Sequence, residues 1–210
     1  PAGSVVSEAL LAKNLGISRT PVGEAIRQLW REGLVQQVPR YGTIVKPIER
    51  RELIELYEMR AALESYAAGK AAERFEEQTI DRLQEFCDVM HTIAEELESA
   101  GVNELDESRL SRFIAADMAF HMTIVDSVGN RRMAESVQTM RTVSRIFRAR
   151  RVKHDQKVVH RARNYHREIL EAIRSRDGER ARQKMAEHIN ISMAESVKHL
   201  DQESERYSSS

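Results

Sequence analysis

Four residues on three predicted helices have the side-chain types of a metal site. Asp117 and His121 stand four positions apart in "AADMAFHMTIV", so they share one helix face with apolar residues. His166 and His188 each lie on an apolar face of a later helix. A carboxylate or imidazole on such a face must be paired or must bind something. Either each histidine is a hydrogen-bonded core residue, or the four hold Zn²⁺, Ni²⁺ or another borderline divalent ion, with open positions for solvent or a ligand.

A second stretch, "SRTPVGEAIRQL" at residues 18–29, has the pattern of a helix that reads DNA. Arg19, Gly23 and Arg27 recur every four residues, which predicts that they share its exposed face. A shorter helix in "SEALLAKNLG" precedes it, with Ser7 as the expected N-cap. Two helices joined by a tight turn place the second helix in a major groove.

Two short β-rich runs follow these helices. "LVQQVP" and "TIVKPI" flank the turn "RYG", which predicts a hairpin with a basic tip. Helices and hairpin together predict a winged helix-turn-helix over residues 1–48. The residues expected to contact DNA lie on the second helix and at the wing tip: Ser18, Arg19, Thr20, Gly23, Arg27, Arg40, Tyr41, Gly42 and Thr43.

The rest of the chain shows only helical periodicity. The expected helices cover residues 49–73, 77–100, 107–128, 130–152, 156–176 and 178–203. Short loops between them favour an antiparallel arrangement of neighbours. We therefore expect a mainly α protein, in which the winged helix-turn-helix precedes an all-α antiparallel bundle at 49–207 and a disordered tail at 208–210.

Composition narrows the possible surroundings of the protein. The 210 residues carry a formal net charge of +0, yet residues 1–48 hold six Lys/Arg against three acidic residues. A single cysteine, Cys87, excludes an internal disulfide and favours a reducing cytoplasm. No apolar run approaches the roughly 20 residues that a membrane span needs. The chain begins at Pro1 rather than Met, so we expect that a natural N-terminus is missing.

Several motifs resemble one family of bacterial regulators. "SEALLAKNLGISRTPVGEAIRQLWREGLV" and "RYGTIV" resemble the winged helix of GntR-type regulators. "LYEMRAALESYAAGKAAER", "ADMAFHMTIVDSVGN" and "HREILEAIRSRDGERARQKMAEHI" resemble the effector-binding FCD domain of the FadR subfamily. The similarity covers nearly the whole chain in the family's order.

The resemblance implies a cytoplasmic, homodimeric, metabolite-responsive regulator of transcription, most often a repressor, that binds double-stranded operator DNA. It implies an effector that is a small carboxylate, such as a sugar acid or another organic acid. It also implies that Asp117, His121, His166 and His188 form the family's metal site, and that Arg60 lies near the effector. Arg148 and Asn190 are further candidates for that cavity. The alternative for Arg60 is an ion pair with a glutamate between helices.

The sequence departs from the family at two positions that face DNA. Family members commonly have arginine where this chain has Ala9 and Gly23. Either DNA binding is weaker or has another sequence preference, or Gly23 lets the DNA backbone approach closely, or the chain was altered or truncated. We also expect that the family's first winged-helix element is missing before Pro1.

Two other functions compete with the regulator. A metal with an open position can activate water, as in a hydrolytic enzyme. However, no second carboxylate is placed as a general base, and an enzyme would have no role for the DNA-binding half, so we expect no enzyme. A ligand or metal sensor that has lost DNA binding is the other alternative.

The basic run from Arg141 to Arg163 is expected to be mainly a solvated or salt-bridged face, with one or two arginines that attract an anionic effector.

Overall fold

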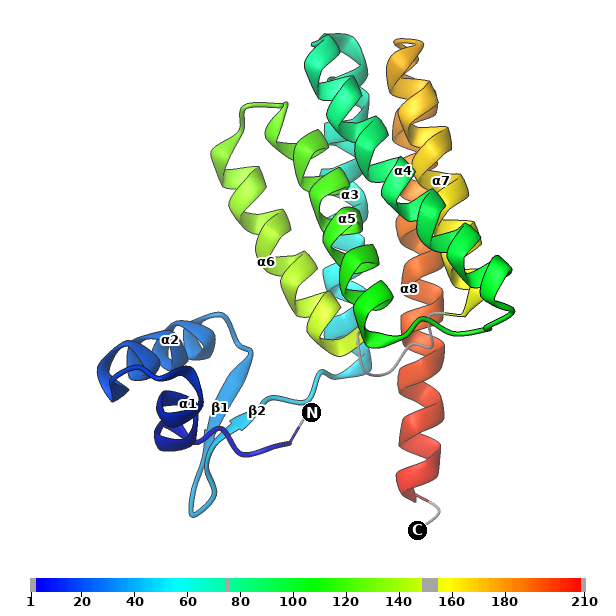
Figure 1. The fold of residues 1–210 in the computed structure, drawn as a ribbon. Coiled ribbons are helices and arrows are strands. Elements are labelled where there is room, and N and C mark those ends of the chain that lie inside the picture. The colour runs from blue at the N-terminus through cyan, green and yellow to red at the C-terminus, as the bar shows by residue number, and fades with distance from the viewer. Residues whose placement is uncertain (1–2, 75, 149–154, 209–210) are drawn as a thin grey trace. The chain divides into compact units, whose positions relative to one another are not determined.

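The structure is a computed structural model that describes residues 3–74, 76–148 and 155–208. The chain divides into two compact units, Pro1–Glu52 and Leu53–Ser210. Figure 1 shows a small N-terminal unit with a two-stranded sheet and a larger unit made of long helices. No helix among the described residues is both long and apolar enough to cross a membrane.

The N-terminal unit contains two short helices and a hairpin. Helix α1 (Glu8–Leu15) begins at Ser7, whose hydroxyl accepts a hydrogen bond from Leu10 N at 3.3 Å, as the sequence predicts. It ends at Gly16 in the left-handed conformation, which glycine adopts without steric strain. Helix α2 (Arg19–Arg31) follows Ser18, which occupies the N-cap position without a capping hydrogen bond. The core of this unit consists of the apolar residues Ala12, Val22, Ile26 and Val35, with Val6 and Leu29 packed against them.

Strands β1 (Val35–Val38) and β2 (Gly42–Val45) form the predicted hairpin. They pair antiparallel, and Val35 lies opposite Val45. The turn requires positive φ at both Arg40 and Gly42. The segment before α1 pairs with the other side of β2. Gly3 N and Val6 N donate to the backbone oxygens of Val45 and Thr43, and Val45 N donates to the backbone oxygen of Ser4. The winged helix-turn-helix is therefore present.

The larger unit is a helical bundle. Its helices are α3 (Arg50–Arg74), α4 (Glu77–Ala100), α5 (Glu107–Asp126), α6 (Arg131–Arg148), α7 (Gln156–Arg174) and α8 (Gly178–Ser208). Helix α4 packs against α5 and α7, α5 packs against α6, and α7 packs against α8 (Figure 1). Fully buried side chains from α4, α5, α7 and α8 fill the core, among them Met90, Ile93, Phe120, Ile169 and Met185. The predicted fold class is confirmed.

Helix ends follow the sequence closely, because side chains that accept backbone hydrogen bonds mark them. Asp106, Asp155 and Asp177 accept from the backbone nitrogens of Arg109, Val158 and Arg180 at the starts of α5, α7 and α8. The end of the helix expected at 130–152 lies outside the described residues beyond Arg148.

Two glycines let α3 and α8 approach closely. A Cβ atom added to Gly178 would lie 3.0 Å from the backbone oxygen of Gly69. One added to Gly69 would lie 3.2 Å from the backbone oxygen of Gly178. Farther along the same two helices, the hydroxyls of Tyr57 and Ser196 share a buried hydrogen bond of 2.9 Å. Gly69 lies beside Gly178, whereas the earlier residue Tyr57 lies beside the later residue Ser196, so α3 and α8 are antiparallel.

Gly178→Ala is expected to destabilise the protein by about 1–3 kcal/mol, because the added methyl group must push two backbones apart. Urea unfolding followed by circular dichroism measures the change. Gly23→Ala is the matched contrast, since its added Cβ meets only the Glu8 side chain at an ordinary 3.7 Å. That variant is expected to be neutral or stabilising, because alanine favours a helix by about 1 kcal/mol over glycine. Equal effects of both substitutions would contradict the close crossing.

Candidate metal and effector site

The four predicted ligands converge in the larger unit. Asp117 and His121 come from α5, His166 from α7 and His188 from α8, and one ligand atom from each lies within 4.8 Å of all the others. His121 and His166 are fully buried, and His188 is nearly so. The Nε2 atom of His166 lies 3.2 Å from Asp117 Oδ1, and that of His121 lies 3.8 Å from it. Helical spacing on three separate helices thus places one carboxylate and three imidazoles around a common point.

Contacts on the far side of two rings orient the histidines for metal binding. His121 Nδ1 lies 2.6 Å from Glu64 Oε2. His166 Nδ1 lies 2.6 Å from the backbone oxygen of Ala162, which can only accept. The Ala162 oxygen requires a proton on His166 Nδ1, and the Glu64 carboxylate beside His121 favours a proton on Nδ1 of that ring, so Nε2 of each ring presents a lone pair to the centre. Both Nε2 atoms are buried and make no hydrogen bond with any described residue. Orphaned nitrogens of this kind fit a divalent cation.

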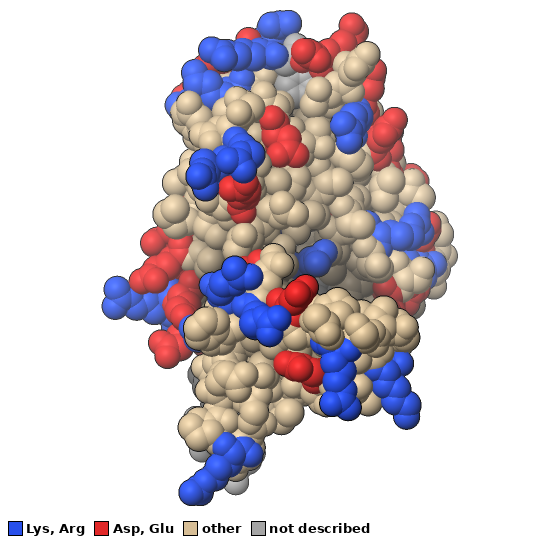
Figure 2. All heavy atoms as spheres, turned by 90° about the vertical axis from the view of Figure 1, so that its left-hand side faces the viewer, with Lys and Arg blue, Asp and Glu red and all other residues tan. Residues whose placement is uncertain are grey.

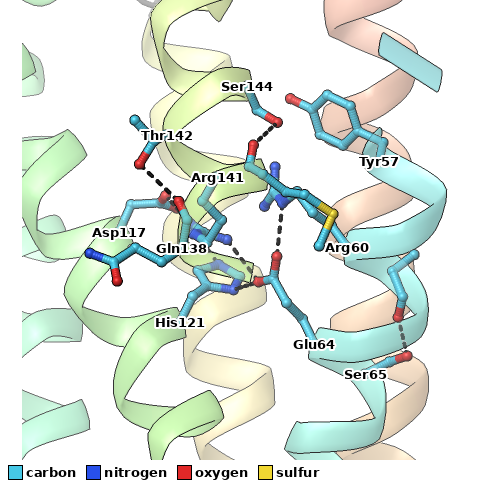
Figure 3. Close-up of polar contacts among 12 residues, drawn as sticks. Tyr57, Arg60, Glu64, Ser65, Asp117, His121, Gln138, Arg141, Thr142 and Ser144 are labelled. Atoms are coloured by element: carbon cyan, nitrogen blue, oxygen red, sulfur yellow. Dashed lines mark hydrogen bonds and ion pairs between the residues drawn. The ribbon is translucent and has the colours of Figure 1, made fainter. Parts of the chain in front are cut away.

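Glu64 of α3 links the cluster to two arginines. Its Oε1 accepts from Arg60 Nε at 2.8 Å, and its Oε2 accepts from Arg141 Nη1 at 2.8 Å. Arg141 Nη2 donates in turn to Asp117 Oδ2 at 2.5 Å. Figure 3 shows Glu64 between Arg60, Arg141 and His121. Arg60, Glu64 and Arg141 are at most 5% exposed, so their charges are compensated within the protein.

Burial and charge set the ionisation of this cluster. Burial would raise the pKa of Glu64, but Arg141 and Arg60 outweigh it and hold that pKa well below its usual range. Burial would also raise the pKa of Asp117, and Arg141 again holds it well below its usual range. Burial, helped by Arg141, lowers the pKa of His121 to about 4. Burial lowers the pKa of His188 well below its usual value. The cluster therefore offers an ionised carboxylate and at least two neutral imidazoles, the protonation states that metal ligands need.

A cavity opens beside the cluster. Its empty space is about 760 Å³, a volume that includes open solvent at the mouth. Asp117 and His188 line it together with Arg60 and Arg141. A metal at the cluster would therefore be reachable by a ligand in the cavity.

The structure describes the side chains of two of the three predicted effector residues, Arg60 and Asn190. Arg60 lines the cavity and is also paired with Glu64, so both interpretations of this arginine hold. The prediction that Asn190 points into the cavity is wrong, because its side chain is exposed while its neighbours Ile191 and Ser192 line the cavity. A side chain two positions from His188 on α8 turns to another side of the helix. The side chain of Arg148 lies outside the part of the chain that the structure describes.

The DNA-facing helix α2 differs from the prediction at one residue. Ser18, Arg19, Thr20 and Arg27 are exposed, as expected. Gly23, however, is buried, and the nearest atoms to its added Cβ belong to the Glu8 carboxylate of α1. The prediction that Gly23 lies on the exposed face is therefore wrong. Because α1 crosses this side of α2, a side chain at position 23 would meet Glu8 before it met DNA.

At the wing tip, Arg40, Tyr41 and Gly42 are exposed, and Tyr41 is 70% accessible. Thr43 is instead buried, and its hydroxyl accepts from Gln37 Nε2 at 2.8 Å. Its expected position among the exposed tip residues is wrong, since the first residues of β2 already alternate between faces. Figure 2 shows acidic and basic side chains interspersed over one face of the molecule rather than one broad basic patch.

Sequence reasoning missed the role of two residues. Glu64 was not singled out. Arg141 was expected on a solvated or salt-bridged face, and it does form ion pairs, with Glu64 and Asp117, but at a buried position where its side chain is only 4% exposed. One signal was available for Glu64, namely its position four residues after Arg60 in an alanine-rich helix.

Comparisons with known proteins agree with this architecture. Residues 1–45 match the bacterial regulatory proteins of the gntR family, and residues 55–191 match the FCD domain. The uncharacterized HTH-type transcriptional regulator YdhC of Bacillus subtilis (strain 168) is 26% identical over 96% of this chain and 84% of its own. The gluconate operon transcriptional repressor of Bacillus licheniformis is 26% identical over 61% of this chain and 48% of its own. The solved structure of E. coli McbR/YncC has a TM-score of 0.80 at 20% identity, over 95% of this chain and 89% of that one.

Proposed function

Because this chain belongs to the FCD-containing subfamily of GntR transcriptional regulators, we propose that it represses transcription as a homodimer on operator DNA and that a small carboxylate releases it. The family and its relatives are regulators of transcription rather than enzymes. The observation that carries the effector part is the Asp117–His121–His166–His188 cluster at the wall of a cavity.

The DNA-binding part of the proposal depends on α2 and the wing. Arg19 and Arg27 are exposed on α2, and Arg40 is exposed at the wing tip. Guanidinium groups donate in pairs to guanine in the major groove or to backbone phosphates. One of the relatives is a repressor of the gluconate operon, which supports the proposal that this chain represses transcription.

The effector part depends on charge and on metal chemistry. A bound divalent ion supplies a Lewis acid that attracts an anionic oxygen. Arg60 borders the cavity, and only its Nε atom is used by Glu64, so the rest of the guanidinium can bind a carboxylate. The gluconate named in one relative is a sugar acid, which fits a carboxylate effector.

Helix α3 offers a direct route from the cavity to the DNA-binding unit. It begins at Arg50, only four residues after β2 ends, and it carries Arg60 and Glu64. A ligand that changes how these two side chains are held can shift α3 and thereby the winged helix-turn-helix that precedes it in the chain. To empty an operator that is mostly occupied, the effector must favour the released state by several kcal/mol.

Arg27→Ala is expected to weaken operator binding by about 10–100-fold, as for loss of one good base contact of 1–3 kcal/mol. Fluorescence anisotropy with the gene's own upstream DNA, over a salt series, measures this change. Gly23→Arg is expected to raise operator affinity less than an arginine at an exposed position would, because the new side chain meets Glu8. The salt dependence should fall with each phosphate contact that is lost.

Arg132→Ala is the matched control, since Arg132 lies on α6 of the larger unit and is 84% exposed. It should bind the DNA like the unchanged protein. Binding that ignores the DNA sequence and is unaffected by Arg27→Ala would contradict the regulator. In that case a ligand sensor without DNA binding becomes the better proposal.

A further inference from the structure

The cavity holds more positive charge than one carboxylate needs. Besides Arg60 and Arg141 beside the metal cluster, it is lined by Arg145 of α6 and Arg161 of α7. Among the described residues that line the cavity, only Asp117 and Glu195 are carboxylates, while Glu64, which does not line it, pairs with Arg60 and Arg141. A divalent ion at the cluster would add two more positive charges. A ligand with a single negative charge leaves this wall strongly positive.

The four arginines differ in how they are used. Arg141 and Arg60 are held by Glu64, and Arg141 also by Asp117. Arg145, in contrast, makes no ion pair or hydrogen bond within the described part of the chain, although it lines the cavity. An arginine at a cavity wall that has no acidic partner among the described residues is available to an incoming anion.

Arg161 has a partner that a ligand can replace. Its Nη2 pairs with Glu195 Oε1 of α8, and the two side chains are 38% and 22% exposed. Both residues line the cavity. A partly exposed pair of this kind contributes only modestly to stability, so a ligand carboxylate can replace Glu195 at a small net cost.

The spacing on α6 separates the two anion-binding positions. Arg141 reaches Asp117 at the metal cluster, and Arg145 follows one helical turn later. At 1.5 Å per residue, the two arginines are offset by about 6 Å along α6. We consider a ligand whose first carboxylate lies at the metal and Arg60. If its second charged group is about 6 Å from the first, that group can contact Arg145.

We propose that the effector is a dianion, a short-chain dicarboxylate, whose second carboxylate is bound by Arg145 and Arg161 at the outer part of the cavity. This inference rests on the proposed carboxylate effector and narrows its class. Glu195 holds Arg161 in the ligand-free protein and competes with the second carboxylate. Monocarboxylates fill only the metal end.

Isothermal titration of the Zn²⁺-loaded full chain tests this inference. The probes are dicarboxylates from succinate to adipate, each paired with the monocarboxylate of equal carbon number, such as glutarate with pentanoate. The best dicarboxylate is expected to bind at least about tenfold more tightly than its partner, as for a charge-assisted hydrogen-bonded contact. Arg145→Gln should reduce that ratio to about threefold or less without changing the binding of the monocarboxylate. Glu195→Gln should tighten the dicarboxylate several-fold.

Arg167→Gln is the control, because Arg167 is exposed on the same helix as Arg161 and does not line the cavity. It should leave every affinity unchanged. If paired mono- and dicarboxylates bind equally, or if Arg145→Gln weakens both alike, the dianion inference is overturned while the carboxylate effector stands. If no carboxylate of either series binds the metal-loaded protein, both proposals are overturned.

Discussion

Removal of the divalent metal is expected to lower the unfolding temperature of the helical unit by about 5–10 °C. A metal present at 100 times its Kd stabilises the folded state by about 2.7 kcal/mol, and each kcal/mol shifts the Tm of a domain of this size by about 2–4 °C. Differential scanning calorimetry with and without a chelator measures the shift. The physical cause is that His121 and His166 then bury Nε2 atoms without a hydrogen-bond partner among the described residues.

His166→Ala is expected to abolish this chelator effect and to reduce bound metal to well below one ion per chain. The substitution also removes a buried ring, so its Tm in the absence of metal is not the informative quantity. The difference between metal-loaded and chelated protein is informative, together with metal content by mass spectrometry. His91→Ala is the control, because that side chain is 53% exposed and is not one of the four residues of the cluster. Full metal content in His166→Ala would contradict the site.

The metal cluster could be predicted because helix periodicity is a strong constraint. Asp117 and His121 must share a face at four-residue spacing, and an apolar face must enter the core. Nothing in the spacing alone could show that His166 and His188, on other helices, point to the same place as Asp117. The family resemblance supplied that step, and the structure supplies the distances of at most 4.8 Å.

Glu64 shows why the charged network could not be predicted. Helix α3 carries several glutamates, and an arginine four residues from a glutamate is also the usual pattern of a surface pair. What makes Glu64 special is Arg141, 77 positions later in a strongly basic run. Such a contact depends on how α3 and α6 pack, and no local pattern encodes it.

Gly23 shows the same limit on a smaller scale. Spacing with Arg19 and Arg27 placed it on one face of α2, and that spacing is correct. The sequence did not show how much of α2 is covered by α1. The Glu8 carboxylate of α1 lies against α2 at Gly23, next to the buried Val22. A period of 3.6 residues tells which residues neighbour one another, and the neighbouring helix decides which of them reach solvent.

Glu64→Ala is expected to destabilise the protein by about 3–5 kcal/mol even without metal, since removal of one partner leaves buried charges uncompensated. Arg60 and Arg141 both lose an acceptor at 2.8 Å, and both are at most 5% exposed. His121 loses the carboxylate beside its Nδ1, so its Nε2 is no longer held with a free lone pair. Urea unfolding of chelated protein measures the first effect, and metal content measures the second.

Glu73→Ala is the matched control on the same helix, because the Glu73 side chain is 48% exposed and pairs with the partly exposed Lys70. It should leave both the unfolding midpoint and the metal content unchanged. Glu64→Gln separates charge from shape, since glutamine keeps the volume and one acceptor but not the negative charge between two arginines. If Glu64→Gln is as stable as the unchanged protein, the two guanidinium groups do not need a buried carboxylate. A loss between those of the control and of Glu64→Ala means that the charge itself holds α3, α5 and α6 together around the metal cluster.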